Sequence, residues 1–171
     1  ITHDQRLVAA DVLLEVFLDE ARGLGERFGP LLVQLPPSLA LDGDIAEEFF
    51  SVLRAIHDGE VVCEPRHDSW FGAEGDALLA KHRVARAGAD PARCAAAALP
   101  GGWPHLAYLR LHGSPRMYYS DYPDEALRRV AALLRGYRAS GGTCWCVFDN
   151  TTLGAATGNA LELARLLAEG R

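Results

Sequence analysis

The regular alternation of short apolar runs with segments of helical periodicity is the feature that most constrains the fold. Five runs are apolar at nearly every position and end at charged residues, glycine or proline. They cover residues 31–35, 61–64, 84–87, 106–112 and 143–148. Strands that are apolar on both faces and alternate with helices are typical of a parallel sheet covered by helices. The chain is therefore predicted to have an α/β fold with five parallel strands.

Helical periodicity fills the intervals between these runs. Apolar residues spaced three and four positions apart predict a first helix over residues 4–28. Asp44, with Glu47 three positions later, predicts the N-cap and capping box of a helix over residues 45–57. Asn159 is predicted to cap the last helix. The remaining predicted segments are helices over 76–82, 123–138 and 159–168, and a loop over 88–104.

Composition narrows the class of protein. The chain has 171 residues, 17 basic and 23 acidic, giving a net charge of −6; this length favours a single domain over residues 1–171. General nucleic-acid binding needs phosphate neutralisation, which an acidic chain does not favour. No apolar run approaches 18 residues and no signal peptide is visible, so no membrane partner is expected. The four cysteines, three of them within apolar runs, fit a reducing cytoplasm.

Polar residues are concentrated where the predicted strands end, which is where parallel α/β folds form their sites. Glu64 ends the second strand, and Arg66 and His67 follow it. Arg110 and His112 alternate at the end of the fourth strand, so both side chains are predicted to lie on one face. Charged groups on a buried strand are costly unless paired or hydrated. A functional site and a structural Glu64–Arg110 salt bridge are both consistent with this pattern.

Further candidates lie in the loops after the strands. Tyr118 is a candidate for substrate stacking, although packing of a surface loop is an equal alternative. Asn150 offers neutral hydrogen-bonding groups that could orient a substrate. No cofactor is identified. A divalent metal ion would be compatible with residue types, but no ligand spacing signals one. The candidates by type are Glu64, His67, Asp90, His112 and Asp149.

Several motifs occur in a fixed order along the chain. They read GPLLVQLPPS at 29–38, EPRHDSW at 64–70, YLRLHG at 108–113, YSDY at 119–122, and FDNT followed by GNA at 148–160. Together they resemble the domain of unknown function 72 family, also called YecE-like, over essentially the whole chain. The resemblance implies a TIM-barrel-like fold and no established activity. By motif, the implied site residues are Gln34, Glu64, Arg66, His67, Arg110, His112 and Asn150.

The chain departs from the family pattern in three respects, the first being Pro65 where family members usually have phenylalanine. Family members usually have asparagine where this chain has Asp149, so Asp149 either adds a charge to the site or faces outward. They also have an N-terminal region with further strands, so the five strands here would be the last five of eight in a partial TIM-like barrel. Open sheet edges invite pairing. We expect them to be covered by an N-terminal segment, by self-association, or by local rearrangement.

Three functions are compatible with these residues. The first is an enzyme that hydrolyses a phosphoester or phosphodiester, including nucleic acid, at the C-terminal face of the sheet. In it, Glu64 is the acid/base, His67 or His112 a second proton-transfer group, and Arg66 with Arg110 an anion clamp. An occluded, dry pocket with both arginines locked by carboxylates would refute it. The alternative is a non-catalytic module that binds an anion or nucleic acid. The third, less favoured, is a carbohydrate-active enzyme using Glu64 with Asp90 or Asp149.

Overall fold

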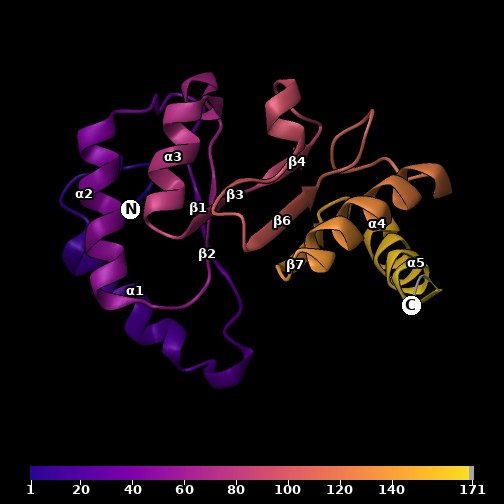
Figure 1. The fold of residues 1–171 in the computed structure, drawn as a ribbon, viewed down its shortest axis with the longest axis horizontal. Coiled ribbons are helices and arrows are strands. Elements are labelled where there is room, and N and C mark those ends of the chain that lie inside the picture. Colours follow the sequence, from indigo (N-terminus) through magenta and orange to yellow (C-terminus); the bar gives the residue numbers. More distant parts are fainter. Residues whose placement is uncertain (170–171) are drawn as a thin grey trace.

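A computed structural model describes residues 1–169 of the protein (Figure 1). The strands within this range are β1 Leu31–Gln34, β2 Val61–Glu64, β3 Val84–Arg86, β4 Gly88–Asp90, β5 Gly101–Gly102, β6 Leu106–Leu111 and β7 Thr143–Phe148. The α-helices are α1 Asp11–Arg22, α2 Gly43–Ile56, α3 Ala73–Lys81, α4 Asp124–Ala139 and α5 Ala155–Glu169. Three short 3₁₀ turns are η1 Gly25–Arg27, η2 Asp68–Phe71 and η3 Ala95–Ala98.

The strands form two sheets, with orders β1-β2-β3-β5 and β4-β6-β7, and every pair is parallel except β3 with β5. β3 and β4 are two halves of one extended run. Only Ala87 separates them, and its N–H donates to the Cys63 carbonyl at 2.8 Å. The first half pairs with β2 and the second with β6, so one strand order runs from β1 to β7 through both sheets. The predicted α/β class with parallel strands is confirmed.

The predicted number of five strands is wrong, because β4 and β5 lie in the stretch expected to be a loop. Gly88 explains why the strand continues past residue 87 although the sequence there is no longer a run of large apolar residues. A Cβ on Gly88 would lie 2.9 Å from Leu109 Cδ2 and from backbone atoms of Leu99 and Pro100. Real Cβ atoms do not approach so closely, so the returning loop can pack on the strand only over a glycine.

The two faces of this sheet have different surroundings. Helices cover the outer face, where α1, α2 and α3 pack on the first strands and α4 and α5 on the last. We call the opposite, helix-free face the inner face. Its apolar part comprises Leu32, Val62, Ala85, Ala87, Leu106, Tyr108 and Val147. Strand alternation then places Gln34, Glu64 and Arg110 on the inner face, each at or near the carboxyl end of its strand.

A side chain of the last strand reaches residues just before the first two strands, but β1 and β7 do not pair. Trp145 of β7 donates from Nε1 to the Glu60 carboxylate at 3.1 Å. Its ring also lies against Gly29, where a Cβ would be 3.1 Å from Cη2. Over the part of the chain that is described, the strands do not close into a barrel. The TIM-barrel-like arrangement and its eight-strand parent therefore stay a prediction.

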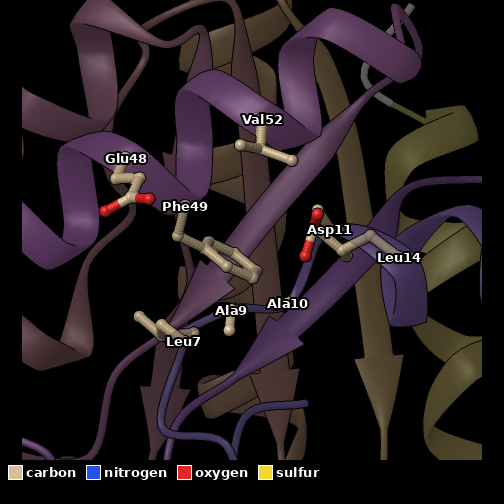
Figure 2. A pocket seen from close by; sticks show the side chains of 8 residues that line it. All are labelled: Leu7, Ala9, Ala10, Asp11, Leu14, Glu48, Phe49 and Val52. Atoms are coloured by element: carbon tan, nitrogen blue, oxygen red, sulfur yellow. The ribbon is translucent and has the colours of Figure 1, made fainter.

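The first helix is shorter than predicted. Its periodicity extended over residues 4–28, but α1 begins at Asp11 and ends at Arg22. Arg6, Leu7 and Ala9 have positive φ, a conformation that L-residues rarely adopt and that cannot continue a right-handed helix. Leu7 is nevertheless buried in the same core as Phe49, which explains why it fits the apolar pattern. Figure 2 shows the cavity between this segment and α2, of about 300 Å³.

Two predicted helix caps are also wrong. The N-cap of α2 is Asp42, whose carboxylate accepts a hydrogen bond from the Ile45 N–H at 3.2 Å. Asp44 instead lies within the first turn, where its charge favours the helix dipole. Glu47, the expected capping-box residue, pairs with Lys81 and His82 of the α3 end. The last helix begins at Ala155, four residues before the predicted cap Asn159.

None of the helices described here is both long enough and apolar enough to cross a membrane. Several large apolar side chains are nevertheless exposed on and beside α1, namely Val8, Val12, Leu13, Val16, Phe17 and Leu24. An exposed apolar patch of this kind is typical of an interaction surface. Self-association of this protein stays a prediction.

Candidate functional site

Six polar side chains meet on the inner face at the carboxyl ends of the strands. We call this group the strand-end cluster; it comprises Gln34, Glu64, Arg66, Arg110, His112 and Asp149. Local structure places each of them. Gln34 and Glu64 are register partners that end β1 and β2, Arg110 lies near the end of β6, and Asp149 follows β7 directly. The parallel arrangement therefore brings together residues that are up to 115 positions apart.

Arg110 organises the cluster. Its Nη1 donates to Glu64 Oε2 at 2.7 Å and to Gln34 Oε1 at 2.5 Å. Its Nε donates to Asp149 Oδ2 at 2.7 Å, and Nη2 lies at the same distance from that oxygen. Burial disfavours the charged form of Arg110, but the adjacent Glu64 and Asp149 carboxylates outweigh it and raise its pKa. One guanidinium group thus ties three strand ends together.

Arg66 contacts the other side of Glu64. Its Nη2 forms an ion pair with Glu64 Oε1, without hydrogen-bond geometry, and donates to His112 Nε2 at 3.3 Å. The Arg66 side chain is 23% exposed, whereas that of Glu64 is 2% exposed. Within residues 1–169, neither Nε nor Nη1 of Arg66 donates a hydrogen bond. Arg66 therefore retains free donors, which Arg110 largely does not.

His112 is buried among these charges. Its Nε2 lies 3.6 Å from Asp149 Oδ2 and 4.0 Å from Glu64 Oε1. Because Nε2 accepts a hydrogen bond from Arg66, the neutral ring carries its proton on Nδ1. Burial lowers the pKa of His112; Arg66 and Arg110 act in the same direction, and the carboxylates of Glu64 and Asp149 oppose it. The imidazole is thus held neutral at pH 7.

Buried polar atoms that lack a hydrogen-bond partner are concentrated here. Across residues 1–169, six buried side-chain nitrogen or oxygen atoms have no hydrogen-bond partner. Four belong to the cluster or to Asn150, which follows it: Glu64 Oε1, Arg66 Nε, His112 Nδ1 and Asn150 Oδ1. Glu64 Oε1 keeps its ion pair with Arg66, so the other three atoms are the ones without any partner. Such atoms are costly and few in native proteins. This concentration marks the strand-end cluster as the candidate functional site.

Stability should depend on pH through His112. Its pKa in the folded protein lies below the ordinary value of 6.5, so the unfolded chain binds more protons as the pH falls below 6.5. The free energy of unfolding should therefore decrease from pH 6.5 downward, by at most about 1.4 kcal/mol per pH unit for this group. Burial also lowers the pKa of His57, which adds a contribution of the same sign.

Urea unfolding at pH 7.5, 6.5, 5.5 and 5.0 checks this expectation. The variant His112→Gln should show a shallower loss of stability than the wild type between pH 6.5 and 5.0. His3→Gln removes an exposed histidine and serves as the control. An unchanged slope in His112→Gln would contradict the burial of a neutral imidazole at this position.

Two other residues singled out from the sequence, His67 and Tyr118, lie outside the strand-end cluster. His67 Nδ1 accepts from the Ser69 N–H and lies 2.9 Å from Ser69 Oγ, so His67 caps η2. Tyr118 stands at the edge of the cluster, with its ring at 73° to that of His112 and centroids 5.9 Å apart. Trp70, three residues after His67, is buried and donates to the Leu39 carbonyl, so it anchors this loop. The catalytic role of His67 and the substrate-binding role of Tyr118 stay predictions.

Asp90 does not join the cluster. It is the register partner of Leu111, so its side chain lies on the outer face. Its carboxylate accepts a hydrogen bond from Tyr122 at 2.7 Å. This position removes Asp90 as a ligand for the cluster and as a catalytic partner of Glu64. Among the residues described, no three His, Cys, Asp or Glu side chains form a group that could hold a metal ion.

Two residues, one in the cluster and one beside Asn150, were left open or wrongly predicted from the sequence. Asp149 was given two alternatives, and the structure places it inside the cluster on Arg110. Asn159 was predicted to cap the last helix, but its side chain is buried and forms hydrogen bonds with residues outside α5. Its Oδ1 accepts from Asn150 Nδ2 at 2.7 Å and its Nδ2 donates to Asp121 at 2.7 Å. An asparagine four residues into a helix carries no local signal for such a role.

A protein-family model described as "Protein of unknown function DUF72" matches residues 1–171, the whole chain. The chain belongs to the DUF72 family. Among curated proteins there is no match to this DUF72 chain. The family description names no activity, so the function of the cluster has to be argued from its geometry.

Solved structures of two other DUF72 proteins share the fold. One is from Thermotoga maritima, with a TM-score of 0.77, 23% identity, and coverage of 93% of this chain and 66% of that one. The other is from Enterococcus faecalis, with a TM-score of 0.75, 16% identity, and coverage of 94% and 67%. The chain thus spans about two thirds of the length of these structures. At such identities the likeness establishes the fold alone.

Proposed function

We propose that the strand-end cluster binds an anionic, phosphorylated substrate and hydrolyses a phosphoester or phosphodiester bond. The observation that carries the proposal is the partly exposed Arg66 side chain beside the buried Glu64 carboxylate and His112 ring, since Arg66 Nε and Nη1 donate no hydrogen bond within residues 1–169. Such unpaired donors next to buried titratable groups are typical of a ligand site. In a parallel α/β sheet, the carboxyl ends of the strands are also where ligands bind.

Arg66 is the residue that contacts the phosphate. It lies on the loop after β2, is partly exposed, and has free Nε and Nη1 donors. A guanidinium group matches two phosphate oxygens with two parallel N–H donors. Arg110 has most of its donors occupied by Gln34, Glu64 and Asp149, so it positions the carboxylates. In this proposal only Arg66 binds the anion, whereas the sequence led us to expect an anion clamp formed by Arg66 and Arg110 together.

Carboxylate pairing of both arginines was the arrangement that would argue against an anion site. The charges of Arg66, Arg110, Glu64 and Asp149 do sum to zero, so the cluster has no excess positive charge. Two observations favour retaining the proposal. Both arginine side chains remain about one fifth exposed, and the Arg66–Glu64 contact lacks hydrogen-bond geometry. Phosphate binding by Arg66 therefore competes with its ion pair to the buried Glu64 carboxylate.

Glu64 acts as the general base in this scheme. Arg110 fixes its Oε2, and Oε1 is left free to take a proton once Arg66 turns to the phosphate. A water molecule attacks phosphorus and transfers its proton to Oε1, and the P–O bond to the leaving group breaks. The departing oxygen takes its proton from solvent, because loss of the Nδ1 proton from the neutral His112 ring would leave an imidazolate anion. Arg66 stabilises the charge that develops on the phosphoryl oxygens.

Turnover of p-nitrophenyl phosphate and bis-p-nitrophenyl phosphate, together with calorimetric binding of inorganic phosphate, tests the proposal. Glu64→Gln should lower kcat by about 10²–10⁴-fold, the usual contribution of a general base, with phosphate affinity nearly unchanged. Arg66→Ala should weaken phosphate binding by about tenfold or more. Arg93→Ala, which removes an exposed arginine paired with Asp68, is the matched control and should change neither.

The outcomes separate the competing functions. Phosphate binding that Arg66→Ala abolishes, without turnover of any phosphoester, would support a non-catalytic anion-binding module. The absence of both binding and turnover would overturn the proposal. Turnover that survives in Glu64→Gln would assign the base to another group.

A further inference from the structure

A second cavity lies on the opposite side of the sheet from the strand-end cluster. It has a volume of about 350 Å³ and lies between the outer face of β4 and β6 and helix α4, beneath η3. This volume falls at the lower end of the range for small-molecule pockets. The walls are mainly aliphatic and include Leu109, Leu111, Val130 and Leu133. The proposed function makes no use of this cavity.

The chain path explains why the cavity exists. α3 packs on β3, and α4 packs on β6 and β7. The segment between β4 and β6 forms only the short turn η3 and the two-residue strand β5, where other strands are followed by a full helix (Figure 1). A single 3₁₀ turn covers less of the sheet than a helix does. Leu99, which follows η3, remains 52% exposed at the rim.

One carboxylate reaches this apolar space. Asp90 lines the cavity, and the Tyr122 hydroxyl donates to its Oδ2 at 2.7 Å. No cation pairs with Asp90 within residues 1–169. Arg129, at the mouth, is already paired with Glu125 at 2.6 Å. Asp90 is half-buried, and its carboxylate has one neutral donor beside aliphatic walls and no ion-pair partner among the described residues.

We propose that this cavity, which we call the Asp90 cavity, binds a small organic amine with an aliphatic or aromatic body. Its ammonium group pairs with the Asp90 carboxylate, and its apolar body lies along Leu109, Leu111 and Val130. The charged hydrogen bond to Asp90 orients the amine, and burial of its apolar part against the aliphatic walls contributes most of the affinity. A neutral or anionic ligand of the same shape would leave the carboxylate unpaired.

The Asp90 cavity is connected to the strand-end cluster by hydrogen bonds. The Tyr122 hydroxyl that donates to Asp90 also accepts from the Gly113 N–H at 2.8 Å. The Asp90 carbonyl accepts from the His112 N–H at 2.8 Å. An amine bound to Asp90 therefore alters groups directly bonded to residues 112 and 113. The amide resonance of Gly113 is consequently a reporter of occupancy that does not depend on any activity.

The experiment is an NMR titration of the full chain with phenethylamine hydrochloride, with 2-phenylethanol as the neutral probe of the same shape. We expect saturable shifts of the Gly113, Leu111 and Val130 amides with the amine, and at least tenfold weaker binding of the alcohol. Asp90→Asn keeps an acceptor for Tyr122 and should weaken amine binding at least tenfold. Asp58→Asn removes an exposed carboxylate outside the cavity and should leave binding unchanged.

A second variant tests the location of the binding site without changing any charge. Ala98→Trp fills the cavity from η3 and should abolish binding of both probes while the remaining spectrum is retained. Three results would overturn the proposal: no saturable shift at these amides, equal affinity for amine and alcohol, or undiminished amine binding by Asp90→Asn. Because the readout is binding, a failure here is distinguishable from a failure of the proposed phosphoester hydrolysis.

Discussion

Replacing Arg110 with methionine should lower the free energy of unfolding by about 3 kcal/mol or more. Removal of one partner from a buried ion pair typically costs about 3–5 kcal/mol, because an uncompensated charge stays behind. Here two carboxylates stay behind, since Glu64 and Asp149 both bind the same guanidinium group. The Arg110 side chain is 20% exposed, so hydration offsets part of the loss and places the effect at the lower end. Urea unfolding monitored by circular dichroism measures it.

A double-mutant cycle separates charge from packing in this prediction. Asp149→Asn in the Arg110→Met background removes one of the two unpaired carboxylates and should recover part of the stability. Arg128→Met is the matched control, because Arg128 forms an exposed pair with Asp124 on α4, and its effect should stay within about 0.5 kcal/mol. A loss in Arg110→Met no larger than that of the control would show that Arg110 does not hold the cluster together.

The parallel α/β class could be predicted because each main strand is a dense apolar run. Runs of this kind occur where both faces of a strand are covered, and Val61, Val62 and Cys63 are indeed fully buried. β4 and β5 carry no such run, since they consist largely of glycine and alanine and owe their existence to pairing with neighbouring strands. Tertiary contacts decide these strands, and local sequence cannot reveal them.

The site could be located but not its internal contacts. Alternation along β6 was sufficient to place Arg110 and His112 on one face, and the parallel topology brought Glu64 to the same end of the sheet. The Glu64–Arg110 salt bridge, one of the two interpretations of the sequence, is present. The contacts of Arg110 with Gln34 and Asp149 were not predictable, because they depend on the separation of side chains from different segments. Asp90 was wrongly considered for the site for a related reason. Its strand β4 was not predicted, so the face of the sheet on which its side chain lies could not be assigned.

The second large effect is expected at Asn159, which links α5 to the loop that ends at Tyr122. Asn159→Ala should lower the free energy of unfolding by about 2–4 kcal/mol, because it removes four hydrogen bonds at a nearly fully buried position. Asn159 Oδ1 accepts from Asn150 Nδ2 and the Tyr122 N–H, and its Nδ2 donates to Asp121 and the Tyr122 carbonyl. Thermal and urea unfolding measure the loss.

The charged variant distinguishes a hydrogen-bond hub from simple packing. Asn159→Asp preserves the acceptor for Asn150 and Tyr122 but places a carboxylate where Nδ2 now donates to Asp121 at 2.7 Å. Two carboxylates at that separation cannot both be ionised without strong repulsion. The loss should therefore be large at pH 7 and smaller at pH 4, where one of the pair takes up a proton. Thr157→Ala, on the exposed side of α5, is the control; equal losses at both pH values would show that the Asp121 contact contributes little.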